Sequence, residues 1–248
     1  MSRSAAFRLR VPVALLAAAL LLLACRPEAG PDRSSTAAPA ARVVLLTGFE
    51  PFGGDSLNAS WEAVLELDGR ELAGCRIVVR QLPVVWGKPM EVLPGLLDEL
   101  RPAAVFAFGQ GRPGGFTFER VGRNARKPFK DNLGRRPERP TVVPDGPDQL
   151  RSPFPMNRLM PALQDAGLPV GVSENAGQYL CDETTYTLEH LRRSRGGFEC
   201  AFFHVPPLGT KLIVSGREAA CDRELLRAFV AKVVESWAAL PPPGSEPN

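Results

Sequence analysis

Two side chains in this sequence, Cys181 and His204, are suited to act together in nucleophilic catalysis. The chain has only two histidines, so a mechanism with an imidazole base must use His190 or His204. His190 lies in a helical pattern beside two arginines and is most simply a surface residue. His204 ends the apolar run 200–203 and is followed by Val-Pro-Pro. That places it at the carboxyl end of a buried strand, where open α/β sheets bind their ligands.

Cys181 has the surroundings that a nucleophilic thiol needs. It follows a glycine-bearing turn and begins a helical pattern, and the free N–H groups and dipole of a helix N-terminus favour the thiolate. Asp182 and Glu183 in the first turn oppose this effect. An unperturbed thiol, with a pKa of about 8.5, is only slightly ionised at neutral pH, and an imidazolium partner would correct that. Without His204, a packed core cysteine would be an equally good interpretation.

A third group should orient the imidazole, and Glu119 is the candidate. It lies in the strongly β-forming stretch 116–121, where alternation puts Thr117 and Glu119 on one face and the phenylalanines on the other. Spacing does not show that Glu119 reaches His204. An exposed strand carboxylate is the alternative interpretation.

Short β-rich runs alternate with helical patterns along the chain, which predicts an α/β fold of three layers, α/β/α, around a mainly parallel, mixed sheet. We expect a single domain over 42–248. The expected strands are 42–47, 76–82, 104–108, 170–173 and 200–204, and the expected helices are 60–67, 88–100, 156–166, 184–194 and 217–240.

Four loops follow expected strands and should meet at one edge of the sheet. They are the glycine-rich segments 48–54 and 109–111, the segment 173–181, and the residues after His204. Each loop alone has a purely steric explanation, and their joint placement is what predicts a site. The proline-rich segment 127–155 interrupts the alternation, and we interpret it either as a lid or as a surface insertion.

The composition excludes some other classes of function. The formal net charge of +3 comes from scattered residues without a basic stripe, so nucleic acid is not an expected partner. No paired Cys-x-x-Cys spacing or His-Glu-x-x-His occurs, so no metal site is predicted. No Gly-x-Ser-x-Gly elbow supports serine hydrolase chemistry. Cys75, Cys200 and Cys221 could be buried thiols or disulfide partners.

The first residues are typical of an export signal. Three arginines precede an apolar run that is short for a membrane span and ends in Leu-Leu-Ala-Cys25, which is similar to the lipobox of bacterial lipoproteins. We therefore expect a signal peptide over 1–25 with lipidation at Cys25, and a flexible tether over 26–41. The product would be periplasmic or a membrane-anchored lipoprotein. If the segment is instead an uncleaved helix or follows a misassigned start, the protein would be cytoplasmic.

Taken together, the loops resemble the pyroglutamyl peptidase I family, also called pyrrolidone-carboxyl peptidases, over roughly 43–240. Five segments occur in the family's order and at similar spacing. They are 47–54 with Asn58 and 60–62, Gly109-Gln110, 119–121 with Asn124, 176–182 with Tyr186, and 203–208.

The resemblance implies a Cys-His-Glu triad at Cys181, His204 and Glu119, and removal of N-terminal pyroglutamate from peptides through a thioester, without metal or cofactor. The residues implied to bind substrate are Phe49, Phe52, Gln110, Tyr179 and Leu180. Membrane contact would come only through a lipid anchor, and a homo-oligomer is compatible with the family. The alternatives are a catalytically altered relative that binds peptide N-termini, or an envelope lipoprotein that does not cleave.

Overall fold

The computed structural model describes residues 41–241. The expected signal peptide, with Cys25, and the expected tether up to residue 40 lie outside these residues. The first strand begins at Arg42, where the sequence predicts that the domain begins. In the part of the chain that is described, no helix combines the length and the apolar character needed to cross a membrane.

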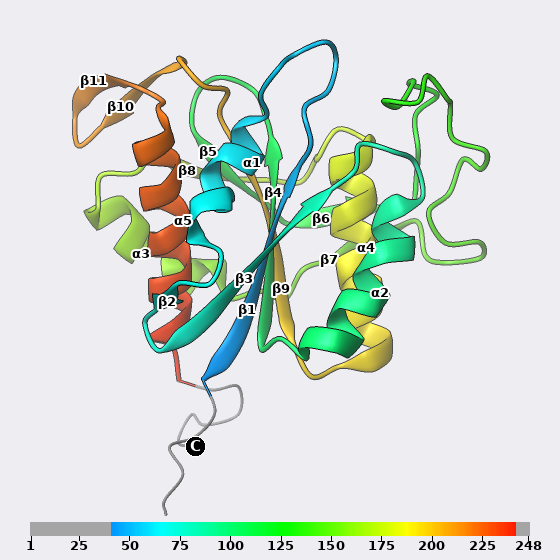
Figure 1. Ribbon diagram of the computed structural model, residues 1–248, viewed down its shortest axis with the longest axis horizontal. Helices are drawn as coiled ribbons and strands as arrows, with labels where there is room; N and C mark the ends of the chain where they lie inside the picture. The colour runs from blue at the N-terminus through cyan, green and yellow to red at the C-terminus, as the bar shows by residue number, and fades with distance from the viewer. Residues whose placement is uncertain (1–40, 242–248) are drawn as a thin grey trace, which may run out of the picture. The chain divides into compact units, whose positions relative to one another are not determined.

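Seven strands form the main sheet, in the order β2-β3-β1-β4-β9-β5-β8 (Figure 1). Neighbouring strands run parallel except at β2–β3 and β5–β9. The predicted mixed, mainly parallel sheet is therefore confirmed. The strands are β1 (Arg42–Phe49), β2 (Glu71–Leu72), β3 (Cys75–Leu82), β4 (Ala104–Gln110), β5 (Phe116–Glu119), β8 (Val170–Ser173) and β9 (Glu199–Val205).

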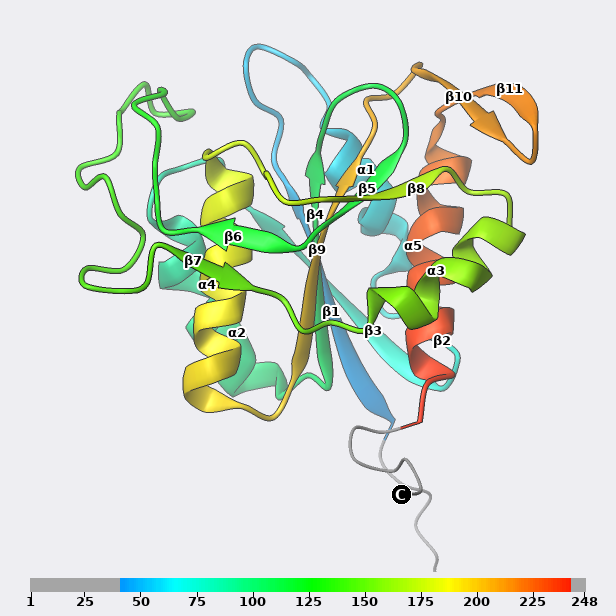
Figure 2. The same cartoon turned by 180° about the vertical axis from the view of Figure 1, so that it is seen from behind.

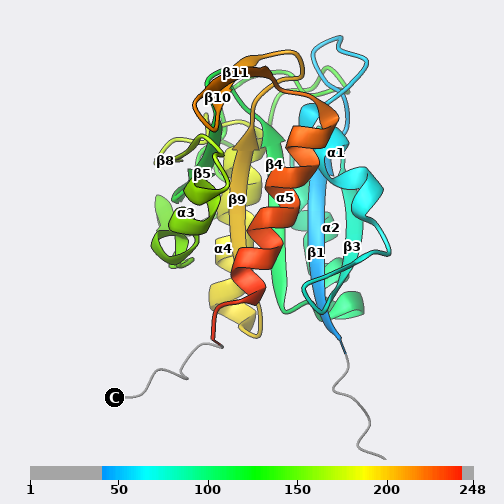
Figure 3. The same cartoon turned by 90° about the vertical axis from the view of Figure 1, so that its left-hand side faces the viewer.

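Helices cover both faces of the sheet and complete the predicted three layers (Figures 1 and 3). On one face, α1, α3 and α5 share a core with the sheet, and on the other, α2 and α4 do so. The helices are α1 (Ala59–Val64), followed by the 3-10 turn η1 (Leu65–Leu67), α2 (Lys88–Leu100), α3 (Met156–Asp165), α4 (Leu180–Arg195) and α5 (Arg223–Ala238).

The central strands are buried on both faces because both faces carry helices. In β1, Val44 and Leu46 pack into the core with α5, whereas Leu45 packs into the core with α2 and α4. Phe106 and Val105 in β4 divide in the same way. Apolar residues at every position are what a parallel strand between two helical layers requires.

The sequence-based expectation of one helix over 217–240 is wrong at its start. Residues Arg217–Ala220 form β11, which pairs antiparallel with β10 (Lys211–Val214). Ser215 and Gly216 both have positive φ (51° and 75°), as a two-residue hairpin turn requires. Helix α5 begins only after Asp222, whose side chain accepts from Leu225 N at 2.8 Å. The Ser-Gly turn was the available signal.

The segment 127–155, interpreted from the sequence as a lid or a surface insertion, contains one strand. Its end contains β7 (Gln149–Arg151), which pairs with β6 (Val121–Arg123) in a small antiparallel ribbon beside α4 (Figure 2). The ribbon lies very close to that helix, because a Cβ added at Gly122 would lie 2.5 Å from Tyr186 N. Leu150 and Tyr186 are buried together at this contact.

The two ends of the described chain lie at the same end of the sheet (Figure 3). Arg42, at the amino end of β1, donates from Nη2 to Ala238 O at 3.2 Å and stacks on the Trp237 ring at 4.8 Å. The carboxyl ends of β1, β4 and β9, where ligands bind in this class of fold, therefore lie opposite to both ends of the described chain.

Candidate active site

A cavity of about 850 Å³ opens at the carboxyl edge of the sheet. Strand β1 contributes Phe49 to its lining, β4 contributes Gln110, β9 contributes His204, β5 contributes Glu119 and β8 contributes Ser173. The N-terminal end of α4 adds Leu180 and Cys181. Within residues 41–241, all eight residues that the sequence assigned to catalysis or substrate binding line this one cavity: Phe49, Phe52, Gln110, Glu119, Tyr179, Leu180, Cys181 and His204.

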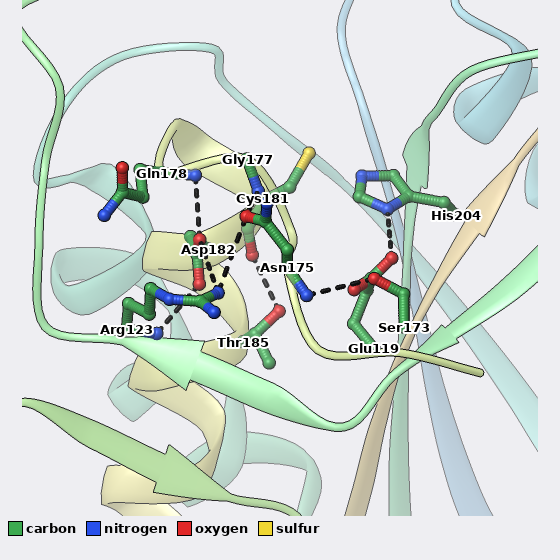
Figure 4. Close-up of polar contacts among 10 residues, drawn as sticks. All are labelled: Glu119, Arg123, Ser173, Asn175, Gly177, Gln178, Cys181, Asp182, Thr185 and His204. Carbon is green, nitrogen blue, oxygen red and sulfur yellow. Dashed lines mark hydrogen bonds and ion pairs between the residues drawn. The ribbon is translucent and has the colours of Figure 1, made fainter.

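Glu119 and His204 are brought together by two adjacent strands. Strand β5 runs antiparallel to β9 with Thr117 opposite His204, so the carboxylate two residues further on reaches the imidazole. The distance from His204 Nδ1 to Glu119 Oε1 is 2.8 Å (Figure 4). Glu119 is 2% exposed and the His204 side chain 15%. Because Nδ1 faces the carboxylate, Nε2 is the nitrogen available for proton transfer.

The pKa of His204 is raised to about 10. Burial alone acts in the opposite direction, because it disfavours the charged imidazolium. The charge and hydrogen bond of the Cys181 sulfur, together with those of the Glu119 carboxylate, outweigh burial. The site therefore favours an imidazolium beside the sulfur at neutral pH.

Cys181 is half-buried at the start of α4. The first backbone bond within the helix is donated by Glu183 N to Tyr179 O at 3.0 Å. The N–H groups of residues 180–182 therefore have no acceptor inside the helix and can stabilise negative charge near the sulfur.

Two glycines at the end of β4 make room for the reactive side chains. A Cβ added at Gly109 would lie 2.9 Å from Cys181 Sγ and 2.8 Å from Phe202 Cζ. A Cβ added at Gly111 would lie 2.7 Å from His204 Cβ. The glycines of segment 109–111 are thus required by close approach to the site.

The two acidic residues after Cys181 have hydrogen-bond partners of their own. Asp182 is fully buried and accepts from Gln178 N at 2.7 Å and Arg123 N at 2.8 Å (Figure 4). It thereby fixes the turn before Cys181 to strand β6. Burial raises the pKa of Asp182, and the two backbone donors oppose the rise.

Glu183 ties the same helix to two further loops. It is fully buried, accepts from Gly87 N at 2.9 Å and forms two hydrogen bonds with Arg126, of 2.7 and 2.9 Å. Burial raises the pKa of Glu183 even though Arg126 lowers it. Sequence reasoning missed the roles of Asp182 and Glu183, because their partners Arg123, Gly87 and Arg126 are distant along the chain and nothing local marks them.

Aromatic side chains and one amide line the part of the cavity beside β1. Phe49 is buried and Phe52 is half-buried. Gln110 Oε1 accepts from Ala59 N at 2.8 Å, which leaves the Gln110 amide nitrogen as a donor for a ligand. Leu180 is buried, and the Tyr179 ring stacks edge-on against Trp86 at 5.0 Å.

The segment 127–155 contacts the rim of this cavity. Tyr179 Oη donates to Lys130 O at 3.0 Å, and Trp86 Nε1 donates to Phe129 O at 2.9 Å. Asn132 Nδ2 donates to Pro51 O at 2.8 Å. These bonds hold the segment against the loops on both sides of the aromatic wall.

Sequence reasoning also missed one side of the cavity. This side is formed by residues 112–115 of the β4–β5 connection and by residues 169–171, which lead into β8, and it adjoins the expected segment 173–181. Their types carry no chemical signal apart from Arg112. In the described part of the chain, no group of three or more His, Cys, Asp or Glu is placed to hold a metal ion.

A nucleophilic cysteine at a helix N-terminus, an imidazole at a strand end and a buried carboxylate behind it define an α/β cysteine hydrolase. A family model described as pyroglutamyl peptidase matches residues 42–233. The chain belongs to the pyroglutamyl peptidase family.

Relatives and solved structures agree with this assignment. A pyrrolidone-carboxylate peptidase from Enterobacter sp. (strain 638) is 43% identical over 171 residues, covering 67% of this chain and 79% of the relative. One from Pseudomonas fluorescens is 40% identical over 202 residues, covering 79% and 93%. The crystal structure of Bacillus amyloliquefaciens pyroglutamyl peptidase I superimposes with a TM-score of 0.72 at 27% identity, covering 80% of this chain and 98% of that one.

Proposed function

We propose that this chain is a cysteine peptidase that removes N-terminal pyroglutamate from peptides. The observation that carries the proposal is that Cys181 and His204 line one cavity with an aromatic wall, and that Glu119 lies against His204 Nδ1 at 2.8 Å. Membership of the family identifies the expected substrate as an N-terminal pyroglutamyl peptide. The geometry provides a nucleophile, an acid–base group and an orienting carboxylate for its hydrolysis.

In the acylation step the Cys181 thiolate attacks the carbonyl carbon of the pyroglutamyl residue. The N–H groups at the start of α4 are placed to stabilise the oxyanion that forms. His204, protonated and held at Nδ1 by Glu119, donates the Nε2 proton to the departing amine. The C–N bond breaks and a thioester to Cys181 is left.

In the deacylation step water takes the place of the leaving peptide. His204 is now neutral and accepts a proton from that water, which attacks the thioester. The C–S bond breaks, pyroglutamate leaves, and the thiolate–imidazolium pair is restored. Glu119 stays buried against the ring throughout and stabilises each imidazolium state.

The aromatic part of the cavity fits the lactam ring. Phe49 and Phe52 provide apolar walls, and the amide nitrogen of Gln110 provides a donor for an amide oxygen. A lactam has an apolar body with one polar edge, and this is the combination that such a wall recognises.

The test is the release of aminocoumarin from pyroglutamyl-aminocoumarin by the purified, reduced chain. Wild type should turn over, and Cys181→Ala should not. Cys221→Ala is the matched control, because Cys221 is buried with its thiol donating to Pro206 O at 3.6 Å, away from the cavity lining. A folded, reduced wild type without turnover would contradict the proposal and favour the non-cleaving alternative.

We also propose that the chain is exported and lipidated at Cys25. The support is the arginine-rich start, the apolar run and the Leu-Leu-Ala-Cys25 sequence. Cells fed radioactive palmitate should label wild type and fail to label Cys25→Ala. A label that is absent from wild type, with the protein in the cytosolic fraction, would contradict export.

A further inference from the structure

The cavity extends along the edge of the sheet and has a second part beyond the triad. The strand order places β1 with Phe49 at one side, β4 and β9 with Gln110 and His204 in the middle, and β5 and β8 at the other side. In the proposed function, the aromatic wall and Gln110 bind the lactam ring. The part beside β5 and β8, lined by Thr117, Gly171 and Ser173 among others, is left for another portion of the substrate.

The chemistry of the triad indicates which portion of the substrate occupies the part of the cavity beside β5 and β8. His204 gives its proton to the departing amine, so the residue that follows pyroglutamate must lie beside His204, on the side away from the aromatic wall. The β4–β5 connection, residues 111–115, passes the end of β9 at this point, because β9 lies between β4 and β5. A Cβ on Gly111 would touch His204, and Gly111 N donates to Val205 O at 2.8 Å.

Arg112 is the next residue and the one cationic side chain, apart from His204, among the residues that line the cavity. It is exposed. The connection that carries it is anchored at its far end as well, where Phe116 N donates to Pro169 O at 2.9 Å. The backbone that carries Arg112 is therefore fixed beside the end of β9, next to the path of the group that leaves past His204.

Acidic side chains near this part of the cavity are already engaged. Glu119, the one carboxylate in the lining, faces His204. Glu174, between the lining residues Ser173 and Asn175, pairs with Arg151 at 2.9 Å and lies 3.9 Å from Arg120. Arg112 thus faces no carboxylate of the cavity that could neutralise it.

We infer that Arg112 selects peptides whose first residue after pyroglutamate carries a carboxylate, either on its side chain or as the free C-terminus of a dipeptide. This inference rests on the proposed function. Guanidinium binds carboxylate through two parallel hydrogen bonds, and at an exposed site the attraction is reduced by salt.

The experiment compares kcat/KM of the full chain on matched substrates. One arm uses pyroglutamyl-glutamate amide against pyroglutamyl-glutamine amide, and the other uses pyroglutamyl-alanine against its amide. The neutral aminocoumarin substrate serves as reference. The variants are Arg112→Gln and Arg112→Lys, with Arg76→Gln as the control, because Arg76 is exposed at the amino end of β3, the opposite end of the sheet.

We expect wild type to prefer the carboxylate member of at least one arm by about tenfold, equivalent to about 1.4 kcal/mol. Arg112→Gln should remove the preference, Arg112→Lys should keep part of it, and Arg76→Gln should change nothing. The wild-type preference should also shrink as salt rises, a readout that does not depend on a variant folding.

Aminocoumarin release with no carboxylate preference in either arm would overturn the inference and leave the proposed function intact. A preference that survives in a folded Arg112→Gln would show that another group provides it, and would also overturn the inference. Failure to cleave any substrate, aminocoumarin included, would overturn both.

Discussion

At the residue scale, a single methyl group added at Gly109 should affect both catalysis and stability. We expect Gly109→Ala to lose nearly all activity, because the new methyl group would lie 2.9 Å from Cys181 Sγ and 2.8 Å from Phe202 Cζ. Overpacking of this kind also destabilises a core by about 1–3 kcal/mol. Aminocoumarin release and urea unfolding would measure the two effects.

Gly95 provides the matched control within α2. A Cβ there would meet nothing within 4 Å. Gly95→Ala should leave kcat/KM unchanged and raise the free energy of unfolding by about 0.5–1 kcal/mol, as alanine does in a helix interior. Full activity in Gly109→Ala would show that the sulfur does not occupy the position described.

The imidazolium state of His204 depends on the charge beside it. Its pKa is raised to about 10 by the sulfur of Cys181 and by Glu119, against the lowering effect of burial. In Cys181→Ala the burial persists and the sulfur's contribution is gone, so we expect the pKa to fall by about one unit or more.

Nuclear magnetic resonance can follow this titration, since the chain has only two histidines. His190→Gln identifies the His204 signal. In wild type that signal should stay in its protonated position from neutral pH until about pH 10, and in Cys181→Ala it should shift at lower pH. Identical titration curves would contradict a charged pair.

At the scale of elements, α4 is joined to the surrounding loops through Glu183. Arg126→Met would leave a fully buried carboxylate without its cation, which we expect to cost about 3–5 kcal/mol at pH 7. Burial already raises the pKa of Glu183, and the loss of Arg126 would raise it further. Glu183 can then take up a proton as pH falls, so the loss should be smaller at pH 5 than at pH 7.

Urea unfolding at the two pH values would measure both effects. Arg195→Met is the control, because Arg195 pairs at 2.8 Å with Asp98 on the surface, where the side chains are 37% and 74% exposed. Exposed pairs contribute at most about 1 kcal/mol. Equal losses in the two variants would show that burial of Glu183 does not matter.

The elements were predictable to the extent that their signals are local. Helix α2 matches the expected 88–100 because residues close together in the sequence determine where it starts and which of its faces is apolar. The start of α5 was missed because Arg217–Ala220 contains good helix formers, and only pairing with β10 makes it a strand.

The site residues also differ in whether a local signal or the strand order identifies them. Cys181 and His204 stood out by type and by position after a turn or a strand. The contact of Glu119 with His204 depends on β5 running antiparallel to β9, and the placement of Arg112 depends on β9 lying between β4 and β5. Strand order is a property of the whole sheet, and no local pattern encodes it.

At the scale of the molecule, thiol reactivity should be confined to the cavity. The four cysteines within residues 41–241 are free, and Cys181 is half-buried whereas the other three are buried. Burial raises the pKa of Cys221 to about 11 and that of Cys200 well above its usual range. We expect brief iodoacetamide treatment of the native protein to modify Cys181 first and to abolish activity.

Peptide mass spectrometry would identify the modified cysteine. Treatment in urea should modify Cys75, Cys200 and Cys221 as well, because unfolding exposes them. Prior modification of any of these three in the native protein would contradict the packing described for them.

The shared position of the two ends of the described chain, near residues 41 and 241, affects how this domain can be attached to a surface. Arg42 and Ala238 are bonded to each other at the end of the sheet opposite the cavity. A bead, an electrode or a fused partner linked through either end should therefore leave the cavity open to solution. Immobilised enzyme made in both orientations should keep similar kcat/KM, whereas coupling through Lys130, whose carbonyl bonds Tyr179 at the rim, should obstruct entry.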